Sequence, residues 1–194
     1  MRSGFQRMVR VIVLLPVLLL SACGGGDDHY QPSDFGMTGV EFHDAFYNEA
    51  MPFWAPDYVY SEPVSGLEDG EKTLTREIWF SDGSGIPRTV LKTFLTPDDR
   101  VKRVQVIMYA DPRMAAHDSL AEGRFYTWRR TYGTSVGILA PNAPDADFAT
   151  MHATIQEKID NSQLWDTITI GGLVFTLSYD DATDPPVMSV TISY

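Results

Sequence analysis

Residues 74–109 read LTREIWFSDGSGIPRTVLKTFLTPDDRVKRVQVIMY, and this stretch decides the fold. Apolar and polar residues alternate in it, which is the pattern of β-strands with one buried face. The alternation occurs in three runs: 74–80, 89–95 and 101–109. The turn formers Asp82-Gly83-Ser84-Gly85 and Pro97-Asp98-Asp99 separate these runs. The segment therefore predicts a three-stranded antiparallel meander.

A second set of alternating runs closes the chain. Residues 167–170 and 173–178 flank a Gly171-Gly172 turn, and residues 187–192 follow an acidic loop that contains two prolines. This predicts a second meander. The two meanders are candidates for the two halves of one sheet.

The segment before the first meander predicts a helix over residues 39–51. Thr38-Gly39-Val40-Glu41 fits a capping box, and Met37 with Phe42 fits a hydrophobic staple. Pro52 ends the helical pattern. We expect a short strand at 58–60 after it, and then a polar loop over 61–70.

The stretch between the meanders is less regular. Asp111-Pro112 predicts a helix start, with a short helix over 115–122 that Gly123 closes. Residues 124–132 are aromatic and alternate, which favours a strand, with a helix as the alternative. Asp147 is the expected cap of a further helix, whose apolar stripe is formed by Phe148, Met151, Ile155 and Ile159.

The order of these elements lacks the regular strand–helix alternation of parallel sheets. We therefore predict one α+β domain over residues 36–194. It should have a mostly antiparallel, curved sheet, with two or three helices packed on one face.

The N-terminus has the pattern of an export signal. Arg2, Arg7 and Arg10 precede an apolar run over residues 11–20. That run is too short for a permanent membrane helix, which needs roughly 20 apolar residues. We expect residues 1–22 to be removed.

Leu20-Ser21-Ala22-Cys23 follows this run and resembles the lipobox of bacterial lipoproteins. The resemblance implies cleavage before Cys23, a diacylglyceryl group on its thiol, and palmitate as a further acyl chain. Residues 23–35, rich in glycine and acids, then form a flexible tether. The expected location is the cell membrane or the outer membrane, facing the periplasm or the exterior.

The composition limits the class of partner. The chain carries a net charge of −11, and the signal segment would remove three arginines from it. Because nucleic-acid binding depends on clustered Lys and Arg, we expect no nucleic-acid partner. Cys23 is the single cysteine, so once acylated it leaves no thiol for a disulfide.

The sequence offers little that predicts catalysis. Gly133-Thr134-Ser135-Val136-Gly137 matches the serine-hydrolase pattern, which needs a long helix after the serine. Pro141 and Pro144 follow closely, so we interpret this motif as a turn or a strand end. Histidines stand at positions 29, 43, 117 and 152 without metal-ligand spacing. We predict no cofactor, no metal site and no enzymatic activity.

Aromatic residues suggest a binding surface instead. The candidates on expected strands are Trp54, Tyr58, Tyr126 and Trp128, unless loops bury their rings. The favoured function is a membrane-anchored, non-catalytic envelope lipoprotein that binds a protein or another envelope component. The first alternative is a lipoprotein that binds a small hydrophobic ligand or lipid, and the second is a serine hydrolase.

Overall fold

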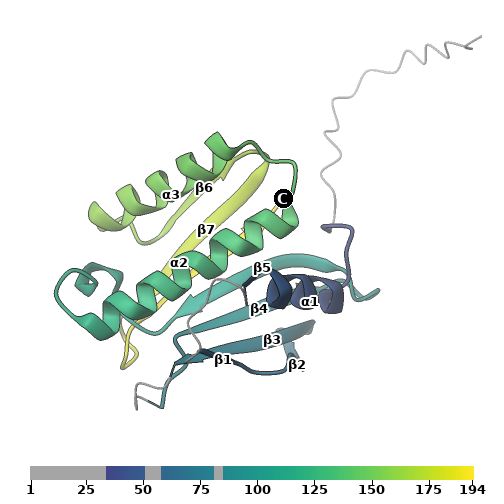
Figure 1. Cartoon of the computed structure of the whole chain (residues 1–194), viewed down its shortest axis with the longest axis horizontal. Helices are drawn as coiled ribbons and strands as arrows, with labels where there is room; N and C mark the ends of the chain where they lie inside the picture. The colour runs from purple at the N-terminus through teal and green to yellow at the C-terminus, as the bar shows by residue number, and fades with distance from the viewer. Residues whose placement is uncertain (1–33, 51–57, 81–84) are drawn as a thin grey trace, which may run out of the picture. The chain divides into compact units, whose positions relative to one another are not determined.

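The computed structural model describes residues 34–50, 58–80 and 85–194, which form an α+β domain with an open antiparallel sheet and three helices (Figure 1). The helices are α1 (Gly39–Ala50), α2 (Ser119–Leu139) and α3 (Asp145–Asp160), with a 3-10 turn η2 (Pro112–Met114). The strands are β1 (Tyr58–Tyr60), β2 (Val64–Glu68), β3 (Glu71–Phe80), β4 (Thr89–Leu95), β5 (Val101–Met108), β6 (Asp166–Ile170), β7 (Leu173–Asp180) and β8 (Val187–Ser193). The predicted fold class is confirmed.

The sheet joins the two meanders along one pair of strands. Its order is β1-β3-β4-β5-β8-β7-β6, and β2 pairs with β3 beside β1. β5 and β8 run antiparallel, with Val106 opposite Val190. The expectation that the two meanders are halves of one sheet is therefore correct.

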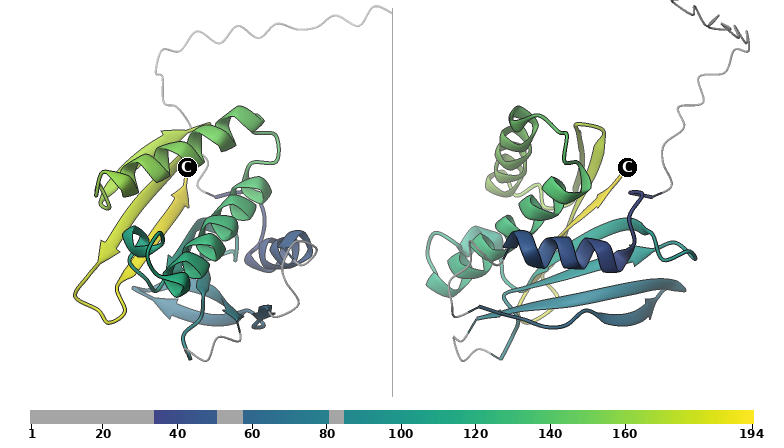
Figure 2. Two further views of the ribbon diagram at one scale, coloured as in Figure 1. Left: turned by 60° about the vertical axis from the view of Figure 1, so that its left-hand side comes forward. Right: turned by 45° about the vertical axis from the view of Figure 1, so that its right-hand side comes forward.

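The three helices lie on one side of the sheet, which curves around them (Figure 2). Leu91, Val106 and Val190 form part of a row across the central strands, and all three are fully buried under the helices. α2 lies over this row, and the Trp128 indole donates a hydrogen bond to the Val106 carbonyl oxygen at 2.9 Å. The opposite face of β7 and β8 carries mostly polar residues, as their alternating pattern predicts, whereas β4 also buries Val90 and Phe94 on that face.

The start of α1 forms as its sequence indicates. The Thr38 backbone N–H donates to Glu41 at 2.8 Å, and the Glu41 N–H donates to the Thr38 hydroxyl at 3.2 Å. Phe42 is fully buried. The capping box thus positions α1 against the sheet.

The strand favoured for residues 124–132 is wrong, and its helical alternative is correct. These residues belong to α2, which also runs through Gly123 instead of ending there. Asp118 caps the helix by accepting from the Leu120 N–H. The physical reason is tertiary: Trp128, Tyr132 and other residues at helical spacing pack into the core, and this burial outweighs strand propensity.

Three smaller expectations need correction. β2 lies within the segment predicted as a polar loop, because its backbone pairs with β3 while its side chains stay mostly exposed. α3 begins at Asp145 after Pro144, so Asp147 lies inside its first turn instead of capping it. Residues 115–122 do not form a separate short helix, since α2 begins at Ser119. The predicted apolar stripe of α3 is otherwise confirmed, with Met151, Ile155 and Ile159 buried.

Candidate functional site

Only part of the predicted aromatic surface is exposed in the described residues. Trp54 and the lipidation site Cys23 lie outside the described residues. Trp128 is fully buried, so its assignment to the surface is wrong. Tyr58 is half-buried and its hydroxyl lies 3.1 Å from that of Thr127. Tyr126 is 54% exposed on α2 and is the strongest remaining candidate.

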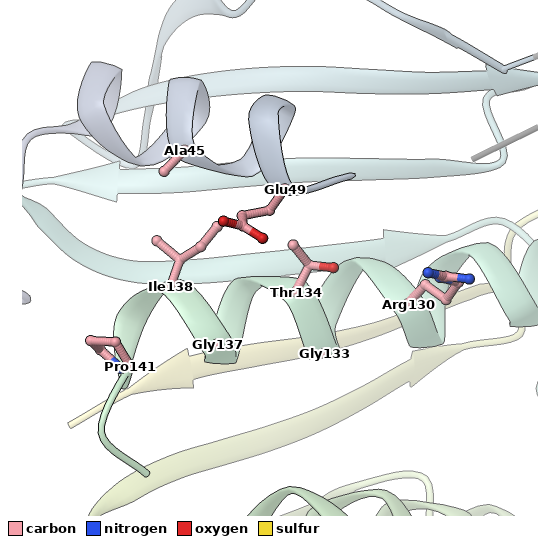
Figure 3. Close-up of a pocket in the computed structure, with 8 residues that line it drawn as sticks. All are labelled: Ala45, Glu49, Arg130, Gly133, Thr134, Gly137, Ile138 and Pro141. Carbon is pink, nitrogen blue, oxygen red and sulfur yellow. The ribbon is translucent and has the colours of Figure 1, made fainter. Parts of the chain in front are cut away.

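A groove lies between α1 and α2 (Figure 3). Its volume is about 640 Å³. The residues that line it are Ala45, Glu49, Arg130, Gly133, Thr134, Gly137, Ile138 and Pro141. Glu49 extends from α1 toward α2, where Thr134 and Ile138 point back toward it (Figure 3). We call this feature the α1–α2 groove.

The α1–α2 groove combines opposite charges with a hydroxyl and an apolar side chain. A carboxylate from Glu49 stands on one side and a guanidinium from Arg130 on the other. Arg130 donates to the Tyr126 hydroxyl at 2.8 Å and lies 5.6 Å from the centre of that ring. Arg130 lines the groove, and its hydrogen bond holds the exposed Tyr126 beside it, so we call this pair the Tyr126–Arg130 rim. Tyrosine and arginine are the residue types that most often dominate the energy of protein interfaces.

Two glycines of α2 line the groove, and only Gly137 leaves open space beside the helix. A Cβ atom at Gly137 would meet no atom within 4 Å, while one at Gly133 would lie 3.3 Å from the His152 ring. Their spacing of four residues places both near the groove, where a partner can approach the helix backbone closely. Glycine in a helix interior costs roughly 0.5–1 kcal/mol relative to alanine, so neither glycine helps the helix itself.

Alanine substitutions at two glycines of α2 should change the free energy of unfolding in opposite directions. Gly137→Ala should raise the free energy of unfolding by about 0.5–1 kcal/mol, because it adds helix propensity in open space. Gly123→Ala should lower it, by up to about 2 kcal/mol, because its Cβ would lie 1.9 Å from Nη1 of the buried Arg88 and this overpacking outweighs the gain in helix propensity. Urea unfolding of both variants measures the two changes. Changes of the same sign and size would contradict the close packing of Arg88 on α2.

Ser135 is not placed as a catalytic nucleophile. It lies inside α2, fully buried, and its hydroxyl donates to the Thr131 carbonyl at 2.8 Å. Thr131 and Thr127 make the same bond to the carbonyl four residues before each. A nucleophilic serine instead needs an exposed, strained turn. The expectation that the motif is a turn or strand end is also wrong, since it is helical.

A tyrosine–histidine pair joins α2 to α3. The Tyr132 hydroxyl lies 2.9 Å from Nδ1 of His152. Burial raises the pKa of Tyr132, while burial and the charge of Arg129 lower the pKa of His152. Both shifts favour the neutral forms, so the pair acts as a neutral hydrogen bond between the helices. Within the described residues, no cluster of acids, histidines or cysteines has the arrangement of a metal site.

The apolar space beneath α3 is small. Phe148, Met151 and Phe175 are among the residues that line it, and its volume is about 10 Å³. A single water needs at least that much room. This space therefore cannot hold an acyl chain or a similar ligand.

Comparisons of the chain with protein-family profiles, with curated proteins and with solved structures found no match. Among the helices of the described ranges, none is both long and apolar enough to cross a membrane.

Sequence reasoning missed the α1–α2 groove, although one signal for it exists. Under the helical alternative for residues 124–132, Tyr126, Arg130 and Thr134 recur at four-residue spacing and share one face. That spacing predicts an exposed polar and aromatic stripe. Glu49 carries no comparable signal, because α1 comes beside this stripe only in the folded chain.

Proposed function

We propose that this protein is a membrane-anchored envelope lipoprotein whose α+β domain binds a protein partner through the α1–α2 groove. Lipid on Cys23 would hold the domain outside the cytoplasm, as its lipobox-like sequence implies. The observation that carries the binding proposal is the exposed Tyr126–Arg130 rim beside a groove of about 640 Å³.

The geometry favours an extended or helical segment of a protein as the ligand. The α1–α2 groove is open along the two helices and presents both Glu49 and Arg130, so a partner with paired charges finds complementary groups. The open space at Gly137 allows a backbone to come close to α2. Amphipathic helices bind in grooves of this kind through side chains on one face.

The alternative functions have less structural support. A hydrophobic-ligand carrier needs an enclosed apolar cavity; the space beneath α3 is far smaller than the several hundred Å³ of typical ligand sites, and the larger hollows at the β2–β3 and β4–β5 turns are open to solvent. A serine hydrolase needs Ser135 accessible, and this side chain is fully buried. Partner binding is therefore the function that the described geometry supports best.

One experiment tests the proposal in two arms, starting with the anchor. Cells that produce the chain or its Cys23→Ser variant are labelled with palmitate and fractionated. The parent chain should take up label and enter the membrane fraction, since two or three acyl chains anchor stably. The variant should do neither. Equal labelling of both forms would contradict the anchor.

The second arm tests the α1–α2 groove. The anchored chain is cross-linked in its own host, and the captured proteins are compared among variants. Gly137→Leu should fill the groove and Tyr126→Ala should remove its rim, so both should lose the same partner. Thr150→Ala, exposed on α3, is the control and should keep it. A partner retained by both groove variants would rule out this surface.

A further inference from the structure

A second hollow surface lies at the end of the domain where the described chain begins. The Phe35 N–H donates to the Val101 carbonyl at 2.8 Å, and the Gly39 N–H donates to the Asp99 carbonyl at 2.9 Å. These bonds place the start of α1 beside the β4–β5 turn, at one end of the sheet (Figure 1). The chain before Asp34 therefore leaves the domain at this end.

Two adjoining cavities form this surface. One, of about 400 Å³, lies between the first residues of α1 and strand β2. The other, of about 570 Å³, lies between the β2–β3 and β4–β5 turns. Both are lined by Lys72 and Leu95, so they lie side by side, and we treat them together as one hollow. We define the entry-end surface by Val40, Leu67, Lys72, Leu95, Pro97 and Lys102.

The rim of the entry-end surface is apolar and strongly exposed. Val40 is 61% exposed on α1 and Leu67 is 73% exposed on β2. They stand on the two sides of the hollow, one in each cavity. Val40 and Leu67 thus place two exposed aliphatic side chains at the same end of the domain, where burial of both in an apolar phase would be favourable.

The charges of the entry-end surface are balanced locally. The Lys72 ammonium lies 2.8 Å from Asp99, and the Lys102 ammonium lies 2.6 Å from Glu71. The surface is thus close to neutral, although the chain carries a net charge of −11. This excludes strong attraction to anionic lipid and suits a zwitterionic lipid surface, where aliphatic side chains enter between the headgroups.

The length of the tether makes the bilayer the favoured occupant, and this step depends on the proposed lipid anchor at Cys23. The twelve residues from Cys23 to Asp34 span at most about 40 Å, and a Gly-rich chain of that length typically spans about 18 Å. A domain of about 160 residues is about 40 Å across. The tether is therefore usually shorter than the domain, so the entry end lies nearest to the membrane.

We propose that the domain docks on the bilayer that holds its anchor, with Val40 and Leu67 inserted at the headgroup boundary. The short tether keeps the entry-end surface at a high local concentration beside the lipid, so a weak contact is enough. Docking would leave the α1–α2 groove in a defined orientation toward a partner.

Photoactivatable phospholipid in phosphatidylcholine vesicles tests the docking. The full chain, purified from membranes and reconstituted, should be labelled on the peptides that contain Val40 and Leu67. Val40→Glu with Leu67→Glu should reduce this labelling roughly tenfold or more, because charges replace buried aliphatic groups. Val59→Glu with Trp165→Glu, at 62% and 70% exposed positions, is the matched control and should keep it.

Unchanged labelling in the Val40/Leu67 variant, or labelling spread evenly over the domain, would overturn the docking proposal. Cross-links between two chains at the same peptides, in place of lipid, would also overturn it and assign the surface to a second copy. Thermal unfolding of each variant checks that the fold is retained.

The mass of the purified chain tests the lipid anchor separately from the docking, which depends on that anchor. A mass without acyl chains would refute the lipid anchor alone. In that case the unmodified chain is coupled through Cys23, its single cysteine, to a maleimide lipid in the same vesicles. The labelling comparison then accepts or rejects docking independently of natural lipidation.

Discussion

Replacing Trp128 by alanine is expected to lower the free energy of unfolding by about 3–5 kcal/mol. The indole is fully buried, and its ring centre lies 4.8 Å from that of Tyr132. Its removal leaves a large cavity and takes the indole donor from the Val106 carbonyl. Because small domains have total stabilities of about 5–15 kcal/mol, urea unfolding should show this variant near the limit of folding.

Tyr126→Ala is the matched control, two residues earlier on the same helix. Its side chain is 54% exposed, so its removal should change the free energy of unfolding by no more than about 0.5 kcal/mol. Similar losses in the two variants would contradict the orientation of α2. The comparison also shows why Trp128 variants cannot probe binding: they would lose a partner by unfolding.

Acidification from pH 7 to pH 4 is expected to remove about 3 kcal/mol of stability through His43 alone. Burial, with the nearby charge of Arg76, lowers the pKa of His43 to about 4 in the folded chain. In the unfolded chain this histidine takes up a proton near pH 6.5. Between these values the unfolded state binds more protons, so stability is complete above pH 6.5 and falls progressively toward pH 4.

Urea unfolding at several pH values, with His43→Gln, isolates this contribution. The variant loses the titrating ring, so its stability should depend less on pH over this range. His117→Gln, at an exposed position, is the control for replacing a histidine that is not buried. Parallel curves for the parent chain and His43→Gln would show that His43 is not held neutral by burial.

Local patterns in the sequence were enough to predict most of the sheet. β4 and β5 occupy almost the predicted residues, because strands with one buried face alternate at a period of two. The capping box at Thr38 and the stripe of α3 were correct for the same reason, since each depends on residues within a few positions of one another. β2 was missed because its pairing comes from the backbone and its side chains carry no pattern.

The predicted binding surface depended on whether residues 124–132 form a strand or a helix. Their local sequence does not decide between the two. In a strand, Tyr126 and Trp128 would share one face. In a helix they point in nearly opposite directions, so one is exposed and the other is core. Packing of α2 on the sheet favours the helix. In this helix Trp128 lies in the core and is not part of the proposed surface.

By itself the sequence determined the α+β class, the two meanders, the capped start of α1 and an acidic chain with one cysteine, because each follows from composition or short-range periodicity. Only the tertiary structure decided which side of α2 faces water, and that Glu49 stands across the groove from an arginine about 80 residues away. Such contacts depend on how distant segments pack, and no local pattern encodes them.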